Sequence, residues 1–529
     1  MITGILTTKN YKQFAIRDSA YNVLAEFEGA KKANPALHGD HVTLGPDGRL
    51  TVERRAEHPM LAGLLHMKSN TIYGLTSHGV PIYLFYPFDS RYPPFRVGSK
   101  ADKSQNRLAL IRVADFGAAD TFPRGNLERI LGPAGDLEVE KQALAFTASP
   151  FIKKISPKAY VASPEQRQHI CESYITVNID PEGCKDIDDV ISLKANNDGS
   201  WSCIISIADV DDAVPAGSEM DLYAQKTLQT VYNMGRAERP MLPEVLSEGI
   251  CSLIPGSPRP TVGLKFRYVP KNDEGCRIVD CQFNKYYLTN QKSYSYEEII
   301  GATDFPVTAL KEIVTEVSGA QTEDSHEWVA QLMMFYNLKA AEILGSSGIY
   351  RAHDGPNLER LSQLKTFMSE TDAQMLSNSA AKYILGSAEG DKTHFGFDGR
   401  LYAHATSPIR RYADLYNQRL IKAFIDNAAS VAVGEAHELV YKLNEANKAA
   451  RNFDRTCRFM DGLATTESQD AIVIGLEDDT VKIYVVPWKM TFKMNRLDGE
   501  FDLGSKIKVN YYFDASKVSW KSRMVFQTV

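Results

Sequence analysis

Paired cysteines, long apolar runs and a strong charge imbalance are all missing from this sequence. Its 7 cysteines are scattered and include no CxxC pair, which argues against a disulfide framework and against a zinc site. No apolar run approaches the roughly 18 residues of a membrane helix, and no secretory signal is recognisable at the start. We therefore expect a reducing, cytoplasmic compartment and no association with a membrane.

The composition is that of a soluble globular protein with several domains. Hydrophobic residues make up 43% and charged residues 24% of the 529 residues, and the net charge is −6. Such a balance gives no overall attraction to nucleic acid or to a membrane surface. A chain of this length is too long for one hydrophobic core, so we expect separate domains.

The order of predicted strands and helices divides the chain into four parts. Short strands and turns predict two small barrels at 1–58 and 59–150, and a third barrel of the same OB type at 465–529. The motif HGDHVTL, which starts at His38, is typical of the cold-shock form of such a barrel. The part between them, 151–464, mixes strands with long helices, which predicts an α+β domain with a central sheet.

Six aromatic residues crowd one stretch of the second predicted barrel, close to several basic residues. Such a stretch can stack on and neutralise a single-stranded nucleic acid, but alternating aromatics in strands also commonly form a core. The sequence leaves both interpretations open for these residues: Tyr83, Phe85, Tyr86, Phe88, Tyr92 and Phe95.

Four aspartates lie within ten residues in the stretch ITVNIDPEGCKDIDDVISL, which spans 175–193. The β-branched flanks predict two short strands, and the residues between them predict a loop. Carboxylates gathered on a clamped loop repel one another unless a proton or cation intervenes, and hard oxygen ligands suit Mg²⁺ or Mn²⁺. The alternative is a solvated acidic turn. An EF-hand is excluded because its ligand ladder is missing. The aspartates are Asp180, Asp186, Asp188 and Asp189.

Two adjacent arginines occur in the stretch HATSPIRRYADLYNQRL, which spans 404–420. Ser407 as N-cap and Pro408 as first helical residue predict a helix start, which would place Arg410 and Arg411 in the first turn. Cations there are disfavoured by the helix dipole, so the pair indicates a bound anion such as phosphate. The alternative is a salt bridge, for which Asp414 is close enough in sequence.

Three further residues are ambiguous when they are considered alone. Ser295 and Glu298 predict a capping box that puts Tyr296 at a helix start. Tyr296 and Tyr232 are each either buried with a satisfied hydroxyl or part of a site. Arg458 lies on a long predicted helix with an apolar stripe, where an arginine is usually solvated.

Taken together, these motifs resemble the ribonuclease II/ribonuclease R (RNB) family. The resemblance is carried by IDPEGCKDIDDVISL, IADV, RPMLPEVLSEGICSL, GIYRAH, THFGFDGRLYAHATSPIRRYADL and the late CRF. It implies an α+β catalytic domain with two cold-shock-like barrels before it and one S1-like barrel after it. It also implies a processive, hydrolytic 3′→5′ exoribonuclease that releases nucleoside 5′-monophosphates from single-stranded RNA.

The resemblance also implies roles for individual residues. The four aspartates would bind two Mg²⁺ or Mn²⁺ ions, with Asp188 positioning the metal and the attacking water. Arg458 would stabilise the transition state, Tyr296 would clamp the terminal nucleotide, and Tyr232 would stack on a base. Ser347 occupies the position of the family's second stacking aromatic, so we expect either a different clamp or the use of Tyr350 in its place. A glutamate that the family places near the 3′ end has no match here.

Two other functions follow from the same motifs. The first is a catalytically silent RNA-binding regulator, against which the presence of all four aspartates argues. The second is a nuclease that acts on DNA. Because no helix-turn-helix segment precedes the barrels and no basic tail follows them, we expect single-stranded rather than structured RNA as substrate, and a monomer.

Overall fold

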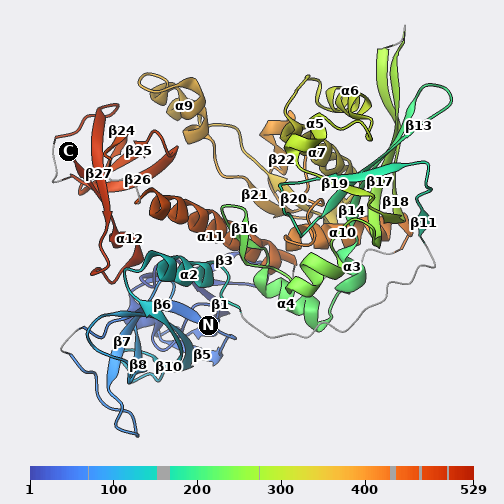
Figure 1. Cartoon of the computed structure of the whole chain (residues 1–529). Helices are drawn as coiled ribbons and strands as arrows, with labels where there is room; N and C mark the ends of the chain where they lie inside the picture. The colour runs from blue at the N-terminus through green and yellow to red at the C-terminus, as the bar shows by residue number, and fades with distance from the viewer. Residues whose placement is uncertain (69–70, 152–166, 273–274, 429–435, 464–466, 497–499) are drawn as a thin grey trace.

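The structure is a computed structural model that describes residues 1–68, 71–151, 167–272, 275–428, 436–463, 467–496 and 500–529. Two β units lie at the N-terminal end of the chain, a mixed sheet with helices forms the middle, and another sheet lies at the C-terminal end (Figure 1). All-β units therefore flank a mixed unit, which confirms the predicted fold class. The boundaries between the parts stay predictions.

The first unit is a five-stranded antiparallel sheet in the order β3-β2-β1-β4-β5. Its strands are β1 (Ile2–Thr8), β2 (Gln13–Arg17), β3 (Val23–Glu28), β4 (His41–Leu44) and β5 (Leu50–Arg54), with the short helix α1 (Ala30–Ala33) between β3 and β4. Leu6, Ile16 and Val42 are completely buried, so one face of the sheet forms a core.

The second unit is a closed barrel in the order β10-β8-β7-β6-β9. It consists of β6 (Leu61–Leu65), β7 (Ile82–Pro87), β8 (Phe95–Gly98), β9 (Arg107–Asp115) and β10 (Arg124–Pro133), and helix α2 (Leu137–Ala148) follows it. Tyr83, Phe85, Tyr92 and Phe95 are buried, which favours the core interpretation of the aromatic stretch. Phe85 and Phe95 share one apolar cluster with Leu6 of the first sheet, so the two units pack together.

The central sheet has seven strands in the order β11-β18-β17-β14-β13-β12-β19. They are β11 (Gln168–His169), β12 (Ile175–Ile179), β13 (Asp189–Ala195), β14 (Trp201–Ala208), β17 (Pro258–Asn272), β18 (Gly275–Thr289) and β19 (Lys292–Tyr294). Val177 lies opposite Ile191, and Ile191 lies opposite Ile205, all of them buried. The β-branched runs thus form the buried middle of the sheet.

Helices and three small strand pairs surround this sheet (Figure 1). The helices are α3 (Val210–Ala213), α4 (Glu219–Thr227), α5 (Tyr296–Ile300), α6 (Val307–Ser318), α7 (Ser325–Ile343) and α10 (Tyr412–Ile425), and Val245–Ile250 forms a π-helical turn. The pairs are β15 (Val231–Asn233) with β16 (Arg236–Arg239), β20 (Ile349–Ala352) with β21 (Lys382–Leu385), and β22 (Thr393–His394) with β23 (Arg400–Leu401). In the described segments, no helix combines the length and apolar character needed to cross a membrane.

The long helix α11 (Ala436–Gly462) connects the middle of the molecule to the C-terminal sheet (Figure 1). That sheet has the order β26-β25-β24-β27-β28, with strands β24 (Gln469–Leu476), β25 (Thr480–Val485), β26 (Met490–Asn495), β27 (Lys506–Phe513) and β28 (Met524–Thr528), and the short helix α12 (Trp520–Arg523). Leu439 and Leu443 of α11 belong to the central core, whereas Phe453 and Phe459 belong to the core of the C-terminal sheet. The helix therefore contributes to two cores.

A second connection to the C-terminal sheet comes from α8 (Leu358–Leu364) and α9 (Glu370–Ser377), which follow β20 and which we call the α8–α9 arm. Leu364 packs in one apolar cluster with residues of the C-terminal sheet. The hydroxyl of Tyr484 donates a hydrogen bond to Asp372 at 2.7 Å. The C-terminal sheet is thus attached to the central unit at two places.

Candidate active site

The four aspartates lie on and beside the loop between β12 and β13. Asp180 directly follows β12, and Asp189 is the first residue of β13. The loop is fixed by Ser252, whose hydroxyl donates to the carbonyl oxygen of Lys185 at 2.6 Å and accepts from the amide of Ile187 at 3.0 Å. The predicted arrangement of strand, loop and strand is confirmed, and it keeps the carboxylates close to one another.

Asp188 is buried, whereas the other three aspartates are half-buried. Its Oδ1 accepts a hydrogen bond from the amide of Ile409, and its Oδ2 accepts one from Nε of Arg410, both at 3.0 Å. Burial raises the pKa of Asp188 to about 7, although Arg410 and the amide act in the opposite direction. The carboxyl group therefore depends on a neighbouring positive charge to remain ionised at neutral pH.

Asp180 and Asp189 are electrostatically coupled to the same cluster. Burial is the main reason why the pKa of each is raised, and Arg410 lowers both. Asp180 and Asp188 add repulsion at Asp189, while Asp186 adds repulsion at Asp180. Burial and like charge thus both oppose full ionisation, and an additional cation would relieve this.

The two adjacent arginines precede α10 instead of lying in its first turn. We predicted a helix that begins at Pro408 with Ser407 as N-cap, but α10 begins at Tyr412 and Arg411 occupies the N-cap position with extended backbone angles. That prediction is wrong. Arg410 and Arg411 therefore lie just before the first turn of α10 and not within it.

The physical reason is a tertiary backbone pairing with the segment before β15. The amide of Thr230 donates to the carbonyl oxygen of Arg410 at 2.9 Å, and the amide of Tyr412 donates to the carbonyl oxygen of Leu228 at 2.8 Å. These bonds hold Arg411 in an extended conformation after the turn at 408–410, which overrides the local helix signal. The salt-bridge alternative holds for Arg411, whose Nη2 lies 2.7 Å from Oδ1 of Asp414.

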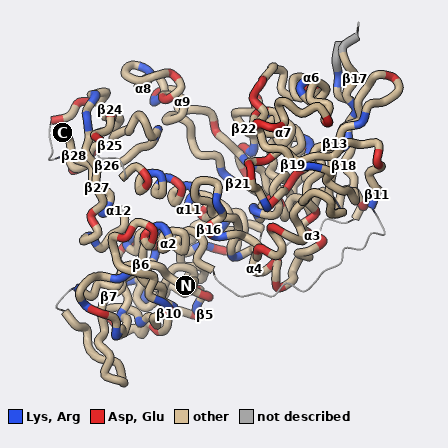
Figure 2. The backbone as a smooth tube through the Cα atoms, in the orientation of Figure 1, with Lys and Arg blue, Asp and Glu red and all other residues tan. Residues whose placement is uncertain are grey.

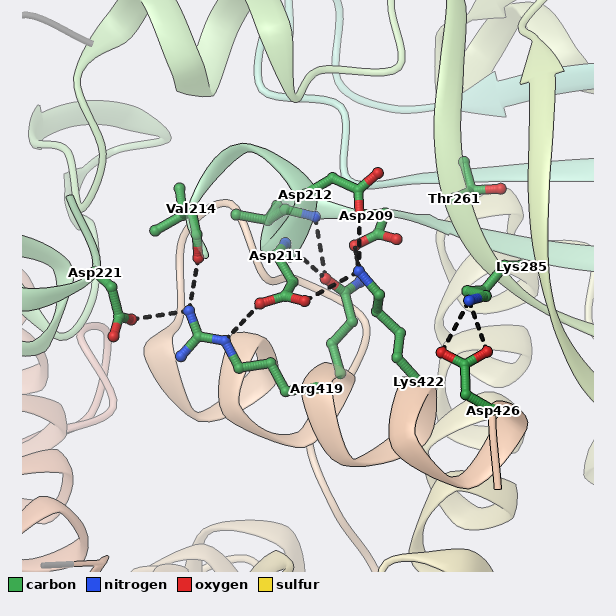
Figure 3. A network of polar contacts seen from close by, with 12 residues as sticks. Asp209, Asp211, Asp212, Val214, Asp221, Thr261, Lys285, Arg419, Lys422 and Asp426 are labelled. Atoms are coloured by element: carbon green, nitrogen blue, oxygen red, sulfur yellow. Dashed lines mark hydrogen bonds and ion pairs between the residues drawn. The ribbon is translucent and has the colours of Figure 1, made fainter. Parts of the chain in front are cut away.

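A buried ionic network fixes α10 at the end of β14 (Figure 3). Its ion pairs are 2.8 to 3.0 Å long and join Arg419 and Lys422 to Asp209, Asp211, Asp212 and Asp221. Next to it, Gln418 donates to the carbonyl oxygen of Ala208, whose own amide donates to the carbonyl oxygen of Asp188, both at 2.8 Å. The segment that carries Arg410 is thereby held beside the acidic loop.

Two of the predicted tyrosines lie close to this cluster. The hydroxyl of Tyr232 in β15 donates to Oδ2 of Asp186 at 2.7 Å. Tyr296 begins α5, and the predicted capping box is confirmed. Burial, followed by the charges of Asp180 and Asp189, raises the pKa of Tyr296 to about 12, so its phenol stays neutral near the carboxylates. Both tyrosine side chains are half-buried.

Tyr350 does not lie at the site in the way we predicted. Its side chain is 2% exposed within the central apolar core, and its hydroxyl donates to the carbonyl oxygen of Gly345 at 2.8 Å. A buried ring with a satisfied hydroxyl offers no face to a base. The position of Tyr350 therefore does not support the stacking role that we assigned to it.

Arg458 lies on the exposed face of α11. Its side chain is 63% exposed and its Nη2 pairs with Asp454 at 3.0 Å, one turn earlier on the same helix. Figure 2 shows acidic and basic residues interspersed along this helix. The structure thus gives Arg458 an ion-pair partner on its own helix, and the catalytic role that the resemblance implies for it stays a prediction.

Arg451 is an arginine of α11 that lies close to Arg351 of β20. It lies seven residues before Arg458, which places it on the same face and roughly 10 Å further back along the helix. Burial, and then the charges of Arg451 and Arg411, lower the pKa of Arg351, which stacks on Tyr383 at 4.5 Å. The sequence analysis did not single out Arg351 or Arg451, because the spacing of seven shows only that Arg451 and Arg458 share one face of the helix.

The carboxylates have the chemistry of a divalent metal site, but their present arrangement is not closed. Hard oxygen donors suit Mg²⁺ or Mn²⁺, and a dication would offset the repulsion within the cluster. In the part of the chain that the structure describes, no three His, Cys, Asp or Glu side chains are arranged to hold a metal ion. Arg410 donates to one oxygen of Asp188, so a bound metal ion would share or compete for that carboxylate.

Two family models match the chain. The model described as the RNB domain matches residues 168–304 and 298–427, which include the acidic loop and the two arginines. The model described as the Dis3-like cold-shock domain 2 (CSD2) matches residues 82–149, which include most of the closed barrel and α2. The two matches follow the order of the units in the structure.

Curated relatives extend over most of the chain at low identity. The exosome complex exonuclease RRP44 homolog A of Arabidopsis thaliana is 25% identical over 496 residues, which cover 76% of this chain and 51% of the relative. Ribonuclease R of Vibrio cholerae is 24% identical over 475 residues, which cover 74% and 57%. The chain spans about half the length of such relatives.

Solved structures confirm the fold. RNase R of Mycoplasma genitalium, determined in complex with ribose methylated single-stranded RNA, covers all of both chains with a TM-score of 0.71 and 16% identity. Yeast Ssd1, described as a pseudonuclease, covers 97% of this chain and 80% of its own with a TM-score of 0.67 and 15% identity. With the RNB and cold-shock matches in the same order along the sequence, this chain belongs to the ribonuclease II/ribonuclease R (RNB) family.

Proposed function

We propose that this protein is a 3′→5′ exoribonuclease that hydrolyses single-stranded RNA processively to nucleoside 5′-monophosphates. The observation that carries the proposal is the cluster of four aspartates beside Arg410, in which burial and like charge raise the pKa of Asp180, Asp188 and Asp189. Perturbed carboxyl groups held in place by a rigid scaffold are typical of catalytic centres. The RNB match over the same residues supports this choice over a purely structural acidic cluster.

The aspartates would act as ligands for the cofactor, for which we propose Mg²⁺ with Mn²⁺ as a substitute. Asp180, Asp186, Asp188 and Asp189 supply the oxygen donors. When bound, two divalent ions supply an activated water and stabilise the leaving 3′ oxygen. Asp188 would hold the position of these groups relative to the phosphate, because its carboxylate oxygens are bonded to the segment before α10 and its backbone is bonded to β14.

The arginines would bind the phosphate that is cleaved. Arg410 lies on the acidic cluster, and Arg411 and Arg451 are close enough to Arg351 to disfavour its charge. A phosphate among these guanidinium groups would relieve their repulsion, and its oxygens match their fork of donors. In the transition state the same groups offset the charge that builds on the phosphate. We therefore assign to Arg451 the role that the sequence suggested for Arg458.

The tyrosines would contact the last nucleotides of the strand. Tyr232 and Tyr296 approach the cluster from different elements, β15 and α5. Stacking on aromatic rings tolerates any base, which suits an enzyme that removes nucleotides one after another. Contacts to the 2′-hydroxyl would distinguish RNA from DNA. The proposal includes a monomer in a reducing, cytoplasmic compartment, in keeping with free thiols at the six cysteines whose side chains the structure describes.

A degradation ladder tests the proposal. Purified protein is incubated with a 5′-labelled single-stranded RNA and Mg²⁺, and with DNA of the same sequence. We expect a ladder that shortens from the 3′ end, release of nucleoside 5′-monophosphates, loss of activity with EDTA, and little cleavage of DNA. An intact RNA with all cofactors present would refute the proposal, and equal cleavage of DNA would refute the RNA preference.

A catalytically silent RNA-binding protein is the second candidate. The observation that favours it is the ion pair between Asp188 and Arg410, which occupies a proposed metal ligand, together with the similarity to the pseudonuclease Ssd1. The same assay separates the two functions, because a silent protein would retard the labelled RNA in a gel and leave its length unchanged.

A further inference from the structure

The rings of Tyr296 and His326 form a close stack beside the acidic cluster. Their centroids are 3.7 Å apart and their planes differ by 19°. Among the ring pairs in the described segments, this is the shortest centroid distance. One face of Tyr296 is therefore covered by an imidazole.

The stack is held from both sides by polar contacts. The hydroxyl of Ser325 donates to the carbonyl oxygen of Tyr296 at 2.6 Å, and Ser325 is 2% exposed. Oδ1 of Asp324 accepts from the amide of His326 at 2.9 Å and lies 3.1 Å from its Nδ1. Because an ionised carboxylate can only accept, Nδ1 carries the proton. These bonds join the start of α7 to the start of α5 and fix the plane of the imidazole.

The position of His326 is not explained by core packing. Its side chain is 61% exposed, and Asp324, its polar partner, is 64% exposed. A ring at the surface contributes little to a hydrophobic core. The ring of His326 acts instead on its neighbour. It restricts the ring of Tyr296, whose hydroxyl lies in the electrostatic field of Asp180 and Asp189.

We propose that His326 is a positioning residue of the active site. By stacking on Tyr296, it fixes the plane of the phenol so that the free edge and hydroxyl meet the 3′-terminal nucleotide beside the aspartates. This inference rests on the proposed exoribonuclease function. It assigns the gripping of the terminal nucleotide to a pair of residues on α5 and α7 instead of to Tyr296 alone.

The expected effect of the stack on the reaction rate is large enough to measure. Aromatic pairs in proteins typically correspond to roughly 3- to 10-fold in an equilibrium or a rate. Because a long RNA has many other contacts, the effect should fall mainly on kcat and little on KM. His326→Ala should thus lower kcat by roughly 3- to 10-fold, whereas His326→Phe, which keeps a flat ring, should restore most of it.

A double-mutant cycle with Tyr296 tests whether His326 acts through that ring. The variants are His326→Ala, His326→Phe, Tyr296→Ala and the double alanine variant, with thermal unfolding as a check of folding. We expect His326→Ala to have no further effect once Tyr296 is removed. An equal loss in both backgrounds, a wild-type kcat for His326→Ala, or a failure of His326→Phe to restore activity would overturn the proposal.

A binding measurement keeps this test separate from the test of activity. An RNA with 2-aminopurine as its 3′-terminal base is titrated with each variant in the Asp188→Asn background, and quenching reports how the terminal base is held. We expect weaker quenching with His326→Ala and near-normal quenching with His326→Phe. If the wild-type protein cleaves no RNA, the proposed function fails, and the quenching alone still decides the role of His326. Equal quenching in all variants would refute that role.

Discussion

Asp188 and Arg410 are separated by 222 residues in the sequence and meet at 3.0 Å through Oδ2 and Nε. Each residue supplies the opposite charge next to the other. Asp188 is buried, with a pKa raised by burial, and Arg410 is the nearest cation that opposes this rise. The pair therefore couples the acidic loop to the start of α10, and it is the first place to test the proposed chemistry.

Asp188→Asn should abolish nuclease activity without unfolding the site. The amide keeps an oxygen that accepts from Ile409, while the charge needed by a divalent ion is lost. We expect the release of mononucleotides to fall on the order of 100-fold or more, with RNA affinity within about twofold. Single-turnover assays and filter binding measure these two quantities. Asp198→Asn, at an exposed turn, is the matched control, and a wild-type rate for Asp188→Asn would contradict the mechanism.

Arg451→Ala and Arg458→Ala should differ sharply in kcat. Arg451 is close to Arg351, whereas Arg458 is exposed and paired with Asp454. We expect a loss in kcat on the order of 100-fold for Arg451→Ala, the size typical of removing a charge-stabilising group. Arg458→Ala should lose less than about threefold, because exposed ion pairs contribute little. The reverse order would return the catalytic role to Arg458.

Tyr232 offers a test of stacking that separates ring from hydroxyl. Tyr232→Phe removes the hydrogen bond to Asp186 and keeps the ring. We expect it to bind single-stranded RNA nearly normally, whereas Tyr232→Ala should lose about 1–3 kcal/mol of binding free energy. Tyr350→Phe, at the buried tyrosine, should leave binding unchanged. Equal losses for both Tyr232 variants would show that the hydroxyl and not the ring is used.

His38 should make the folded state sensitive to acid. Burial, and then Arg91, lower the pKa of His38 from 6.5 to about 3. The folded protein keeps the imidazole neutral, while the unfolded chain binds a proton below pH 6.5, so stability falls as the pH drops from about 6.5 toward 3. We expect a loss of at most roughly 2 kcal/mol between pH 7 and pH 5 from this residue. Urea unfolding at both pH values should show a smaller difference for His38→Asn, and an unchanged difference would contradict this assignment.

Phe459→Ala should destabilise the protein strongly. The side chain is completely buried and its ring lies within about 6 Å of those of Phe492, Tyr511 and Phe526. Removing a buried phenylalanine usually costs about 3–5 kcal/mol of unfolding free energy. Tyr512→Ala is the control, because that side chain is 43% exposed. A change below about 1 kcal/mol for Phe459→Ala would contradict the packing described above.

Local signals in the sequence predicted local structure well. The capping box of Ser295 and Glu298 depends on residues three apart, and the strands around the acidic loop depend on their own β-branched residues. The family motifs also predicted the fold class and the gathering of the aspartates on one loop. These features need no knowledge of distant segments.

The failures share a dependence on distant partners. The helix signal at Ser407 is overridden by backbone bonds to Leu228 and Thr230, nearly two hundred residues earlier in the chain. In the short strand β20 the side chain of Tyr350 could point to either side, and only the packed core shows which side it takes. Arg451 and Arg458 share one face of α11, so their spacing could not show which of them lies close to Arg351.

The two anchors of α11 have a mechanical consequence. Leu439 and Leu443 are fixed in the central core, and Phe453 and Phe459 are fixed in the core of the C-terminal sheet. A helix anchored in two cores couples them, because neither end can rotate without the other. Arg451 lies between the two anchored parts. A movement of the C-terminal sheet relative to the central core would therefore bend or twist the part of α11 that carries Arg451.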